Sequence, residues 1–406
     1  MYLQLGWRNI WRNPRRTAVI MLAVVIGVWS MIFLGALMRG MIEDMIENGI
    51  ATLTGHIQVH HKGYREDPVI DNSIEDPRKV WSAFREALPS TAQWTSRVRV
   101  NAIASNARHS DGVTLVGINP ETEAKVSFIG TGVVQGRYLK PFDTNGIVVG
   151  RALVEKFETK MGRKLVLMSQ DTSGEIASRS FRIVGVFRAE MEATEKQFVF
   201  VSMSTAQRML KLQEGISEVS ISLKDQGEMN RVTNALKEAL PSTYEVHSWR
   251  ELLPLLSAYL RLFDGFMWLW YLVVFIAMGF GIVNTMLMAV FERIREFGLF
   301  KALGMRPWWI VKEVLAESVF LIFIGITIGD IIGFLTVLAL SSHGINLSGL
   351  AAGAEFFGMT RVLYPVISGK DLIMANAVVF VLGLLVSCYP ALKAARFTPV
   401  EALAHT

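Results

Sequence analysis

Three closely spaced histidines, His56, His60 and His61, have a type and spacing that could bind a metal ion. On a strand, His56 and His60 would share one face, and an imidazole nitrogen is a common zinc ligand. However, no further histidine or cysteine lies near them, and the single cysteine, Cys388, allows neither an internal disulfide nor a thiolate metal site. We therefore expect no metal site, and we place the histidines at a solvated strand edge.

Asp330 is a second candidate, because it is the only ionisable residue well inside a long apolar stretch. A carboxylate within a membrane is costly to bury, and it is a functional candidate by default, here as a proton relay or a polar contact between subunits. The alternative, which we favour, places Asp330 near the outer interface or in a hydrogen bond with Thr327 or Thr336. A proton-driven carrier remains open as a function, and it would need no ATPase.

Motifs of catalysis are absent from the sequence. It contains no Gly-x-x-x-x-Gly-Lys-Ser/Thr phosphate loop, no His-Glu-x-x-His metal motif and no Gly-x-Ser-x-Gly nucleophile motif. We therefore expect a chain that is not an enzyme and binds no cofactor. If ATP drives the protein, ATP and Mg²⁺ bind to another chain.

Four long apolar stretches organise the chain, and Asp330 lies in the third of them. Each is long enough to cross a bilayer as a helix, which takes about 20 residues. Lysine and arginine gather before the first stretch, between the second and third, and after the fourth, which predicts that both termini are cytosolic. A cleaved signal peptide is the competing interpretation of the N-terminus, but the apolar run of 22 residues from Thr17 to Met38 is longer than a usual signal.

The sequence thus predicts an α-helical membrane protein with four transmembrane helices and a large extracytoplasmic α/β (α+β) domain. The amphipathic first segment, with Trp7 and Trp11, is typical of a helix lying in the membrane interface. The predicted segments are a cytosolic elbow helix (1–16), transmembrane helix 1 (17–39), the extracytoplasmic domain (40–264), helix 2 (265–291), a cytosolic coupling segment (292–313), helix 3 (314–340), an extracytoplasmic loop (341–371), helix 4 (372–392) and a cytosolic tail (393–406).

Within the large domain, the stretch Arg85–Thr91 recurs as Lys237–Thr243. In both copies an amphipathic helix stops before a proline and a strand-like run follows. This repeat suggests two related helix-strand units, which would form a porter-like subdomain from the two ends of the domain around an inserted β-rich subdomain at about 101–201. Convergence on a common way to stop a helix is the alternative explanation.

The coupling segment combines charge with helical period. The charges of Glu292, Arg293, Arg295, Glu296 and Lys301 can face water or a partner, whereas an apolar stripe contains Phe291, Ile294, Phe297 and Leu303. In the third apolar stretch, Gly325, Gly329 and Gly333 form a stripe of small residues that would let another helix approach closely.

Three motifs carry a resemblance to a known family. Asn9–Thr17 before the first stretch, Glu292–Gly304 after the second and Ala394–Leu403 near the end of the sequence are similar to the MacB/FtsX superfamily of ABC transporter permeases. The order of one helix, a large domain and three helices matches along the whole chain. Within the superfamily, Gly112–Pro120 and Gly146–Leu153 resemble lipoprotein-releasing permeases of the LolC/LolE kind.

The resemblance implies a transmembrane subunit in a bacterial inner membrane that works by mechanotransmission. Two copies of a separate ATPase would bind the coupling segment, and a second permease subunit, identical or different, would complete the complex. A periplasmic lipoprotein carrier is a further implied partner; nucleic acid is not. The coupling residues would be Glu292, Arg293, Arg295, Glu296, Gly298, Lys301, Ala302, Leu303 and Gly304.

In the lipoprotein-releasing version, acyl chains would enter between helices 1 and 2. The residues expected to face the lipid are Phe33, Leu37, Met38, Met41, Phe263, Phe266 and Met267. Methionine and phenylalanine adapt in shape to acyl chains, but the same residues would also suit ordinary helix packing. Efflux of a peptide, antibiotic or lipid, and regulation of an envelope hydrolase, are the alternative functions.

Overall fold

The computed structural model describes residues 2–346 and 362–398. The described chain divides into a helical unit, residues 2–43, 260–346 and 362–398, and a sheet unit, residues 44–259. Part of the predicted loop 341–371 and of the predicted tail 393–406 lies outside the described residues.

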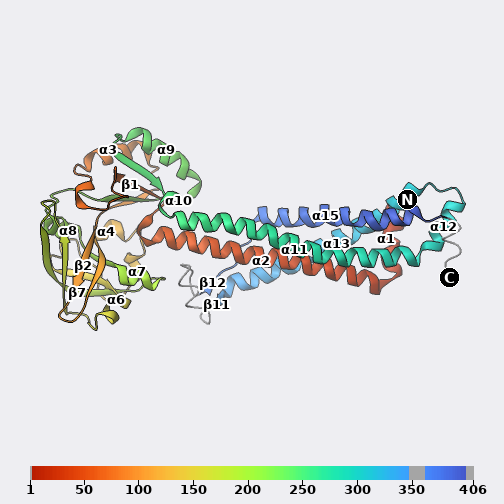
Figure 1. The fold of residues 1–406 in the computed structure, drawn as a ribbon, viewed down its shortest axis with the longest axis horizontal. Helices are drawn as coiled ribbons and strands as arrows, with labels where there is room; N and C mark the ends of the chain where they lie inside the picture. Colours follow the sequence, from red (N-terminus) through yellow and green to blue (C-terminus); the bar gives the residue numbers. More distant parts are fainter. Residues whose placement is uncertain (1, 347–361, 399–406) are drawn as a thin grey trace. The chain divides into compact units, whose positions relative to one another are not determined.

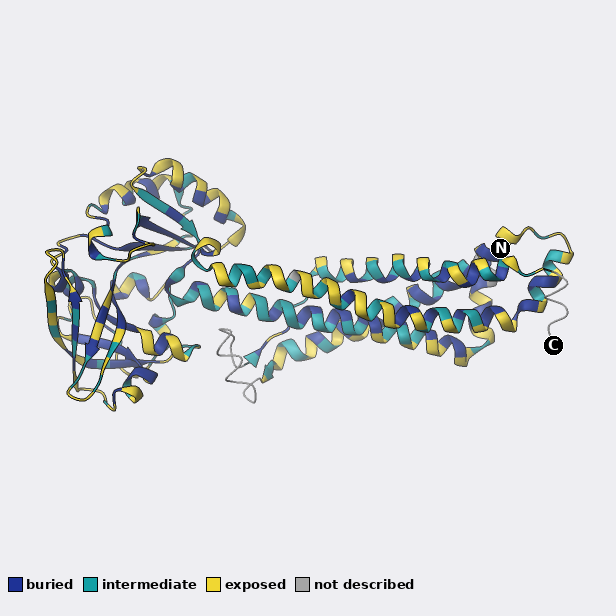
Figure 2. Ribbon diagram, viewed as in Figure 1, coloured by how far each residue is buried: buried dark blue, intermediate teal, exposed yellow. Residues whose placement is uncertain are grey.

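The helical unit is built on four long helices that run alongside one another (Figure 1). They are α2 (Pro14–Gly49), α11 (Pro254–Glu292), α13 (Pro307–His343) and α15 (Gly369–Arg396). In the described part of the chain, these four are the helices long and apolar enough to cross a membrane, which confirms the predicted number. Only 22% to 39% of the residues in each span are buried, so most of their apolar side chains face outward, as in a lipid-exposed bundle (Figure 2).

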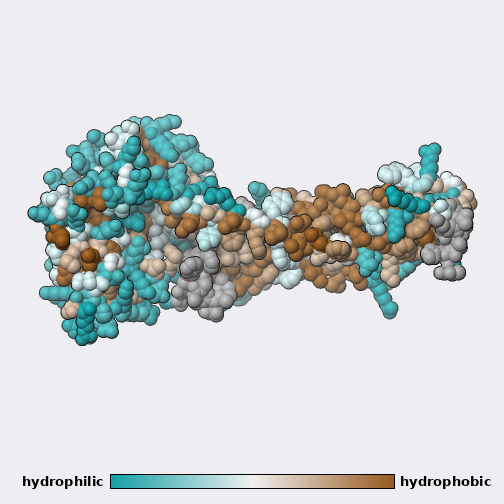
Figure 3. All heavy atoms as spheres, in the orientation of Figure 1, coloured by the Kyte–Doolittle hydropathy of each residue, from teal (hydrophilic) through white to brown (hydrophobic). Residues whose placement is uncertain are grey.

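The distribution of hydropathy on the helical unit fits this interpretation. On the face shown in Figure 3, hydrophobic residues cover the middle of the helices, and hydrophilic residues occur at the end that carries α12 (Ile294–Ala302), which connects α11 to α13. The short helix α1 (Tyr2–Arg12) precedes α2 and packs on α13. Two short strands, β11 (Ile345–Asn346) and β12 (Val362–Leu363), pair after α13.

The glycine stripe lies against α2 of the same chain. A Cβ atom on Gly325 would lie 2.6 Å from Val24, and one on Gly329 would lie 2.8 Å from Val28. Both distances are shorter than side chains tolerate, so only glycine allows α13 to approach α2 this closely. Gly333 meets Ile32 in the same way at 3.1 Å.

The sheet unit contains one ten-stranded sheet in the order β10-β1-β9-β2-β3-β8-β5-β7-β4, with β6 paired to β2 and β7. The strands are β1 (Ile57–His61), β2 (Gln93–Ser105), β3 (Ser110–Ile118), β4 (Val133–Gly136), β5 (Gly146–Gly150), β6 (Lys164–Gln170), β7 (Ile176–Phe187), β8 (Phe198–Ser202), β9 (Glu218–Ser222) and β10 (Tyr244–Ser248). The predicted start of the inserted subdomain, at about residue 101, falls inside β2, which pairs with β9 through its first half and with β6 through its second.

Short helices cover this sheet. They are η1 (Ile50–Thr54), η2 (Ile70–Asn72), α3 (Arg78–Ala87), α4 (Pro120–Glu123), α5 (Ile129–Gly132), α6 (Arg151–Lys156), α7 (Glu192–Gln197), α8 (Met203–Leu210), η3 (Gln226–Glu228), α9 (Met229–Ala239) and α10 (Trp249–Leu252). The helices of the sequence repeat, α3 and α9, pack together, and each leads into a strand, β2 and β10.

The expectation of a solvated edge for the histidines is wrong for His56 and His60. Strand β1 lies between β10 and β9, inside the sheet, and both side chains are buried. The Nδ1 atom of His56 accepts a hydrogen bond from the Leu223 amide at 3.2 Å, and burial lowers the pKa of His56. In the described chain, no cluster of three histidine, cysteine or acidic side chains could hold a metal ion.

Candidate functional site

A cavity of about 440 Å³ opens among α2, the stretch of α11 from Leu260 to Tyr271, and the start of α15. Three of the residues expected to face lipid, Met38, Phe263 and Met267, line it. Its other lining residues are Gly35, Arg39, Ile42, Leu260, Trp268, Tyr271, Lys370, Asp371 and Met374. The other predicted lipid-facing residues, Phe33, Leu37, Met41 and Phe266, do not line it.

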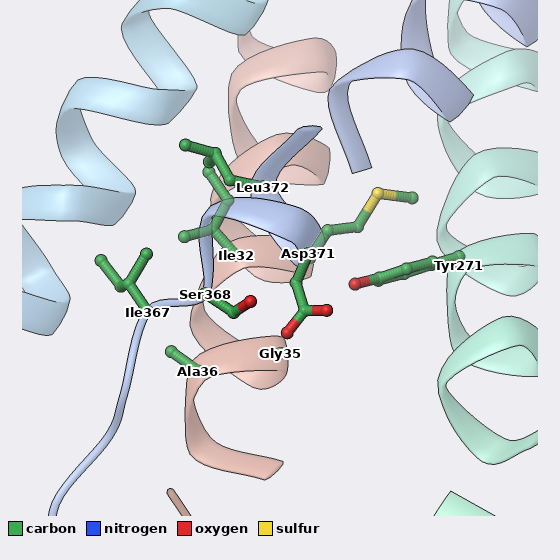
Figure 4. Close-up of a pocket in the computed structure, with 9 residues that line it drawn as sticks. Ile32, Gly35, Ala36, Tyr271, Ile367, Ser368, Asp371 and Leu372 are labelled. Atoms are coloured by element: carbon green, nitrogen blue, oxygen red, sulfur yellow. The ribbon is translucent and has the colours of Figure 1, made fainter. Parts of the chain in front are cut away.

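One side of this cavity is polar. Arg39 on α2 forms a two-point ion pair with Asp371 on α15, with Nε to Oδ2 at 2.6 Å and Nη2 to Oδ1 at 3.0 Å. In the neighbouring smaller pocket, Asp371 lies between Gly35 and Tyr271, whose hydroxyl end points toward it (Figure 4). With Lys370 included, the polar side carries one more positive than negative charge. The cavity can therefore take a long apolar group that ends in a polar or anionic one.

A second candidate region, which we name the Arg293 cluster, lies where α1, α2, α12 and α13 meet. Arg293 donates to Glu313 at 2.6 Å and to Glu296 at 3.1 Å, and it lies 3.5 Å from Glu317. Arg16 forms ion pairs with two glutamates, Glu317 at 3.0 Å and Glu292 at 3.1 Å. The remaining members are Asn9, which donates to Glu313 at 3.0 Å, and Arg12, which donates to Glu296 at 2.6 Å.

The cluster corrects the expectation that the Arg293 charge can face water or a partner, because this residue is only 6% exposed. Burial alone would lower the pKa of Arg293, but its hydrogen bond to Glu313 and the charges around it raise that pKa. For Glu296, burial opposes ionisation, and the hydrogen bonds from Arg12 and Arg293 outweigh it and lower the pKa. Arg293 therefore stays charged and paired inside the protein, whereas Glu296, with a side chain that is 39% exposed, pairs with it at the edge of the cluster.

The other predicted coupling residues divide into two groups. Lys301 donates to the carbonyls of Ala395 at 2.5 Å and Phe397 at 2.6 Å, where α15 ends, and Gly298 is buried. By contrast, Arg295, Ala302 and Gly304 are exposed, and Leu303 is 77% exposed. In the predicted apolar stripe, Ile294 and Phe297 face the core, whereas Phe291 and Leu303 do not. The exposed group, together with the exposed Glu292, presents a surface that a partner could touch.

Asp330 has a different partner from either predicted threonine. Asn376 on α15 donates to its Oδ2 atom at 2.8 Å. The hydroxyls of Thr327 and Thr336 donate to carbonyls of their own helix, those of Phe323 and Ile332. Asp330 thus links α13 to α15, a contact that the sequence pattern did not indicate.

Sequence reasoning also missed a buried charge group in the sheet unit, which we name the Arg97 cluster. Arg97 on β2 forms a two-point contact with Glu123, at 2.9 and 2.8 Å, and donates to Glu218 at 3.0 Å. It also donates to the carbonyl oxygen of Leu53, which accepts a second hydrogen bond from Gln58 at 2.9 Å. An arginine inside an alternating strand was the available signal, but its partners are far away in sequence.

Comparisons with known proteins extend along the chain. The family described as MacB-like periplasmic core domain matches residues 17–239, and the FtsX-like permease C-terminal family matches residues 268–399. A macrolide export ATP-binding/permease protein MacB from Escherichia coli is 26% identical over 99% of this chain and 60% of its own length. A lipoprotein-releasing system transmembrane protein LolC from Xylella fastidiosa is 23% identical over 95% of this chain and 92% of its own length.

The chain therefore spans about 60% of the length of the MacB protein that it matches. Among solved structures, the periplasmic region of MacB from Actinobacillus actinomycetemcomitans covers 52% of this chain and 97% of that chain, at 18% identity and a TM-score of 0.35.

Proposed function

Because this chain belongs to the family of ABC transporter permeases with a MacB-like periplasmic core domain and an FtsX-like C-terminal domain, we propose that it releases lipoproteins from the outer leaflet of the inner membrane. It would act as the membrane subunit of a complex whose ATPase is a separate chain. Both termini and α12 would lie in the cytosol, and the sheet unit outside it.

The cavity among α2, α11 and α15 carries this proposal. An acyl chain needs an adaptable apolar surface, and methionine supplies one because its side chain is unbranched and polarizable. Met38, Met267 and Met374 line the cavity together with Phe263 and Trp268. The adjacent pair Arg39 and Asp371, with Lys370, would hold the polar part of a lipidated protein where its acyl chains end.

The Arg293 cluster would transmit the work of the ATPase. An ATPase would dock on the exposed residues of α12 and on Leu303, which directly follows that helix, and its closure would push α12. The buried contacts of Arg293 with Glu313 and Glu317 would then move α13 along with α12. The ion pairs of Arg12 and Arg16 would carry the same movement into α1 and α2.

Site-specific photo-crosslinking in native membranes tests the cargo. A photoreactive amino acid at Met267, which lines the cavity, should capture an acylated protein, whereas the same group at Phe266, which is exposed and outside the cavity, should not. Capture of the same acylated proteins from both positions, or of phospholipid alone from Met267, would contradict lipoprotein release.

Efflux of an antibiotic or peptide is the second candidate, and the 26% identity to the macrolide export protein favours it. The same crosslinking position separates the two functions. Cells that lack the protein would become sensitive to the exported compound, and Met267 would capture that compound rather than an acylated protein.

The coupling surface has its own test. Leu303→Glu changes an exposed side chain and should leave insertion and folding intact, while it weakens copurification of the ATPase. Val134→Glu, at an exposed apolar position of the sheet unit, is the matched control and should copurify normally. Normal ATPase binding and activity in Leu303→Glu would remove this surface from the proposal.

A further inference from the structure

The sheet unit contains a second cavity, of about 310 Å³, that the proposed function does not use. Strands β1, β2 and β9 form much of its wall, together with the segment that follows β1. Its lining residues are Thr54, Gln58, His60, Tyr64, Arg65, Pro68, Arg99, Val100, Asn101, Thr114, Gln197, Glu218, Leu252 and Leu253. Polar side chains predominate among them, which is unusual for a gap left by imperfect packing.

A buried histidine in this wall is incompletely satisfied. His60 is 3% exposed, and its Nε2 atom lies 3.9 Å from Glu218. Among the described residues, its Nδ1 atom has no hydrogen-bond partner. Buried polar atoms in native proteins are nearly always paired, so an unpaired one calls for an explanation. The ring itself is fixed, because it stacks on Tyr64 at 5.4 Å and the Tyr64 hydroxyl donates to the Arg99 carbonyl at 2.7 Å.

The charges of the cavity favour an anionic ligand over a cation. The acidic side chain in its wall is Glu218, and Arg97 already neutralises that carboxylate from behind at 3.0 Å. Burial alone would raise the pKa of Glu218, but the neighbouring His60 side chain and the charges of Arg99 and Arg97 lower it to about 2. This carboxylate is therefore an ionised and compensated group.

Arg99 has hydrogen-bonding capacity to spare. Its guanidinium is 32% exposed, lies 3.6 Å from Glu218 and sits over the ring of Phe198 at 5.4 Å. A distance of 3.6 Å is an ion pair and too long for a hydrogen bond. No hydrogen bond from this guanidinium to any described residue is present, so its donors remain available. Arg65 at the exposed rim adds a second cation, and it donates to the Glu251 carbonyl at 2.5 Å.

We propose that this cavity binds a small oxyanion that also carries a hydroxyl or amine. Arg99 and Arg65 hold its carboxylate or phosphate, which arginine matches with paired N–H donors, and its hydroxyl or amine donates to His60 Nδ1. The assignment is independent of the cargo proposed above, because it concerns the sheet unit alone.

The cavity lies next to the two segments that connect the sheet unit to α2 and α11. Thr54, in the wall, ends η1, the segment that follows α2 directly in the chain. Leu252 and Leu253, also in the wall, immediately precede α11. A bound ligand therefore contacts both segments through which the sheet unit continues into the long helices.

Calorimetric titration of the full chain in lipid nanodiscs tests the proposal. The probes are glucose 6-phosphate and glucuronate, with glucose as the neutral control. We expect one of the two anions, or both, to bind at one site per chain, and glucose to bind at least about tenfold more weakly. Binding of the phosphate alone assigns a phosphate ligand, and binding of the sugar acid alone assigns a carboxylate ligand.

Variants locate the binding. Arg99→Gln should weaken it by about tenfold or more, because one charge-assisted contact is lost. Arg65→Gln, at an exposed position that cannot affect folding much, should weaken it by a smaller factor, and Arg163→Gln, an exposed arginine outside the cavity, should not change it. Acetate, which lacks a hydroxyl, serves as a further probe for His60. In His60→Phe, the affinity for glucuronate should exceed the affinity for acetate by a smaller factor than in the wild type. The proposal is overturned if neither anion binds, if glucose binds equally well, or if Arg99→Gln and Arg65→Gln both bind like the wild type.

Discussion

The Arg97 cluster and the Arg293 cluster are built alike, because in each of them one arginine is shared among glutamates, two around Arg97 and three around Arg293. They differ in contact with water. Arg97 is 0% exposed, and so is its partner Glu123. Around Arg293 the inner partners Glu313 and Glu317 are buried, but the outer member Arg12 is 55% exposed. In the Arg97 cluster the arginine and both of its glutamates are buried, whereas the Arg293 cluster reaches the surface through its outer ion pairs.

Because of this difference, the Arg97 cluster fixes the segments around it, whereas the outer ion pairs of the Arg293 cluster can break and form again. Breaking a buried ion pair leaves an uncompensated charge in a low-dielectric interior, so the Arg97 cluster holds the Leu53 carbonyl in one place. Exposed ion pairs contribute little free energy, because water and salt compete for both charges. The outer pairs of the Arg293 cluster can therefore open and close at small cost, as a segment that transmits movement requires.

Arg97→Met should have the largest effect. It leaves Glu123 and Glu218 buried without their shared cation, and we expect a loss of about 3–5 kcal/mol in the stability of the sheet unit. Hydrogen exchange of β2 and β9 in the full chain measures this, with the exposed Arg163→Met as the control. Unchanged exchange in Arg97→Met would mean that the cluster does not stabilise the sheet.

Acidification should act on the same cluster through Glu218. The pKa of this group is lowered from an ordinary 4.5 to about 2, because the neighbouring His60 side chain and the charges of Arg99 and Arg97 outweigh the effect of burial. A depressed folded pKa gives stability that is complete above pH 4.5 and is lost as the pH falls toward about 2. Hydrogen exchange of β9 should therefore accelerate in that window. Glu218→Gln should flatten the dependence, whereas Glu158→Gln, on an exposed side chain, should not.

Arg293→Met should have an intermediate effect. It leaves Glu313 and Glu317 without one of their cations, although Arg16 still reaches Glu317. We expect a loss of about 1–3 kcal/mol in the stability of the helical unit. The same variant should reduce coupled ATPase activity in the reconstituted complex. Arg293→Lys keeps the charge but cannot contact several carboxylates at once, so full activity in both variants would argue against a coupling role.

Arg12→Gln should have the smallest effect, since it removes an exposed ion pair with Glu296 at 2.6 Å. We expect less than about 1 kcal/mol, and a difference from the wild type that fades in high salt. Thermal unfolding of the full chain at two salt concentrations measures both. A larger, salt-independent loss would show that the outer pairs are as fixed as the inner ones, and the contrast between the two clusters would disappear.

Local patterns were sufficient for the larger features. The four apolar stretches predicted the four long helices, because the length and composition that a membrane span requires are written in consecutive residues. The helix-stop repeat predicted that α3 and α9 each lead into a strand. The motifs around Asn9, Glu292 and Ala394 indicated the family that the comparisons show.

The same patterns failed where a contact joins distant residues. Residues 97 and 218 are separated by 121 positions, and Asn9 and Glu313 are separated by 304. No sequence feature near any of these residues indicates its partner. For this reason His60 was expected at a solvated strand edge, and the Arg293 charge was expected to face water or a partner. Periodicity states which side chains share a face, but not what covers that face.

The sequence by itself determined the spans, the charged and apolar segments between them and the family, since these depend on neighbouring residues. Only the tertiary structure decided which charges are buried, that Asp330 pairs with Asn376, and which of the Met and Phe residues line a cavity. The physical reason is that the cost of burying a charge depends on the whole surrounding shell, and that shell is assembled from segments that meet only after folding.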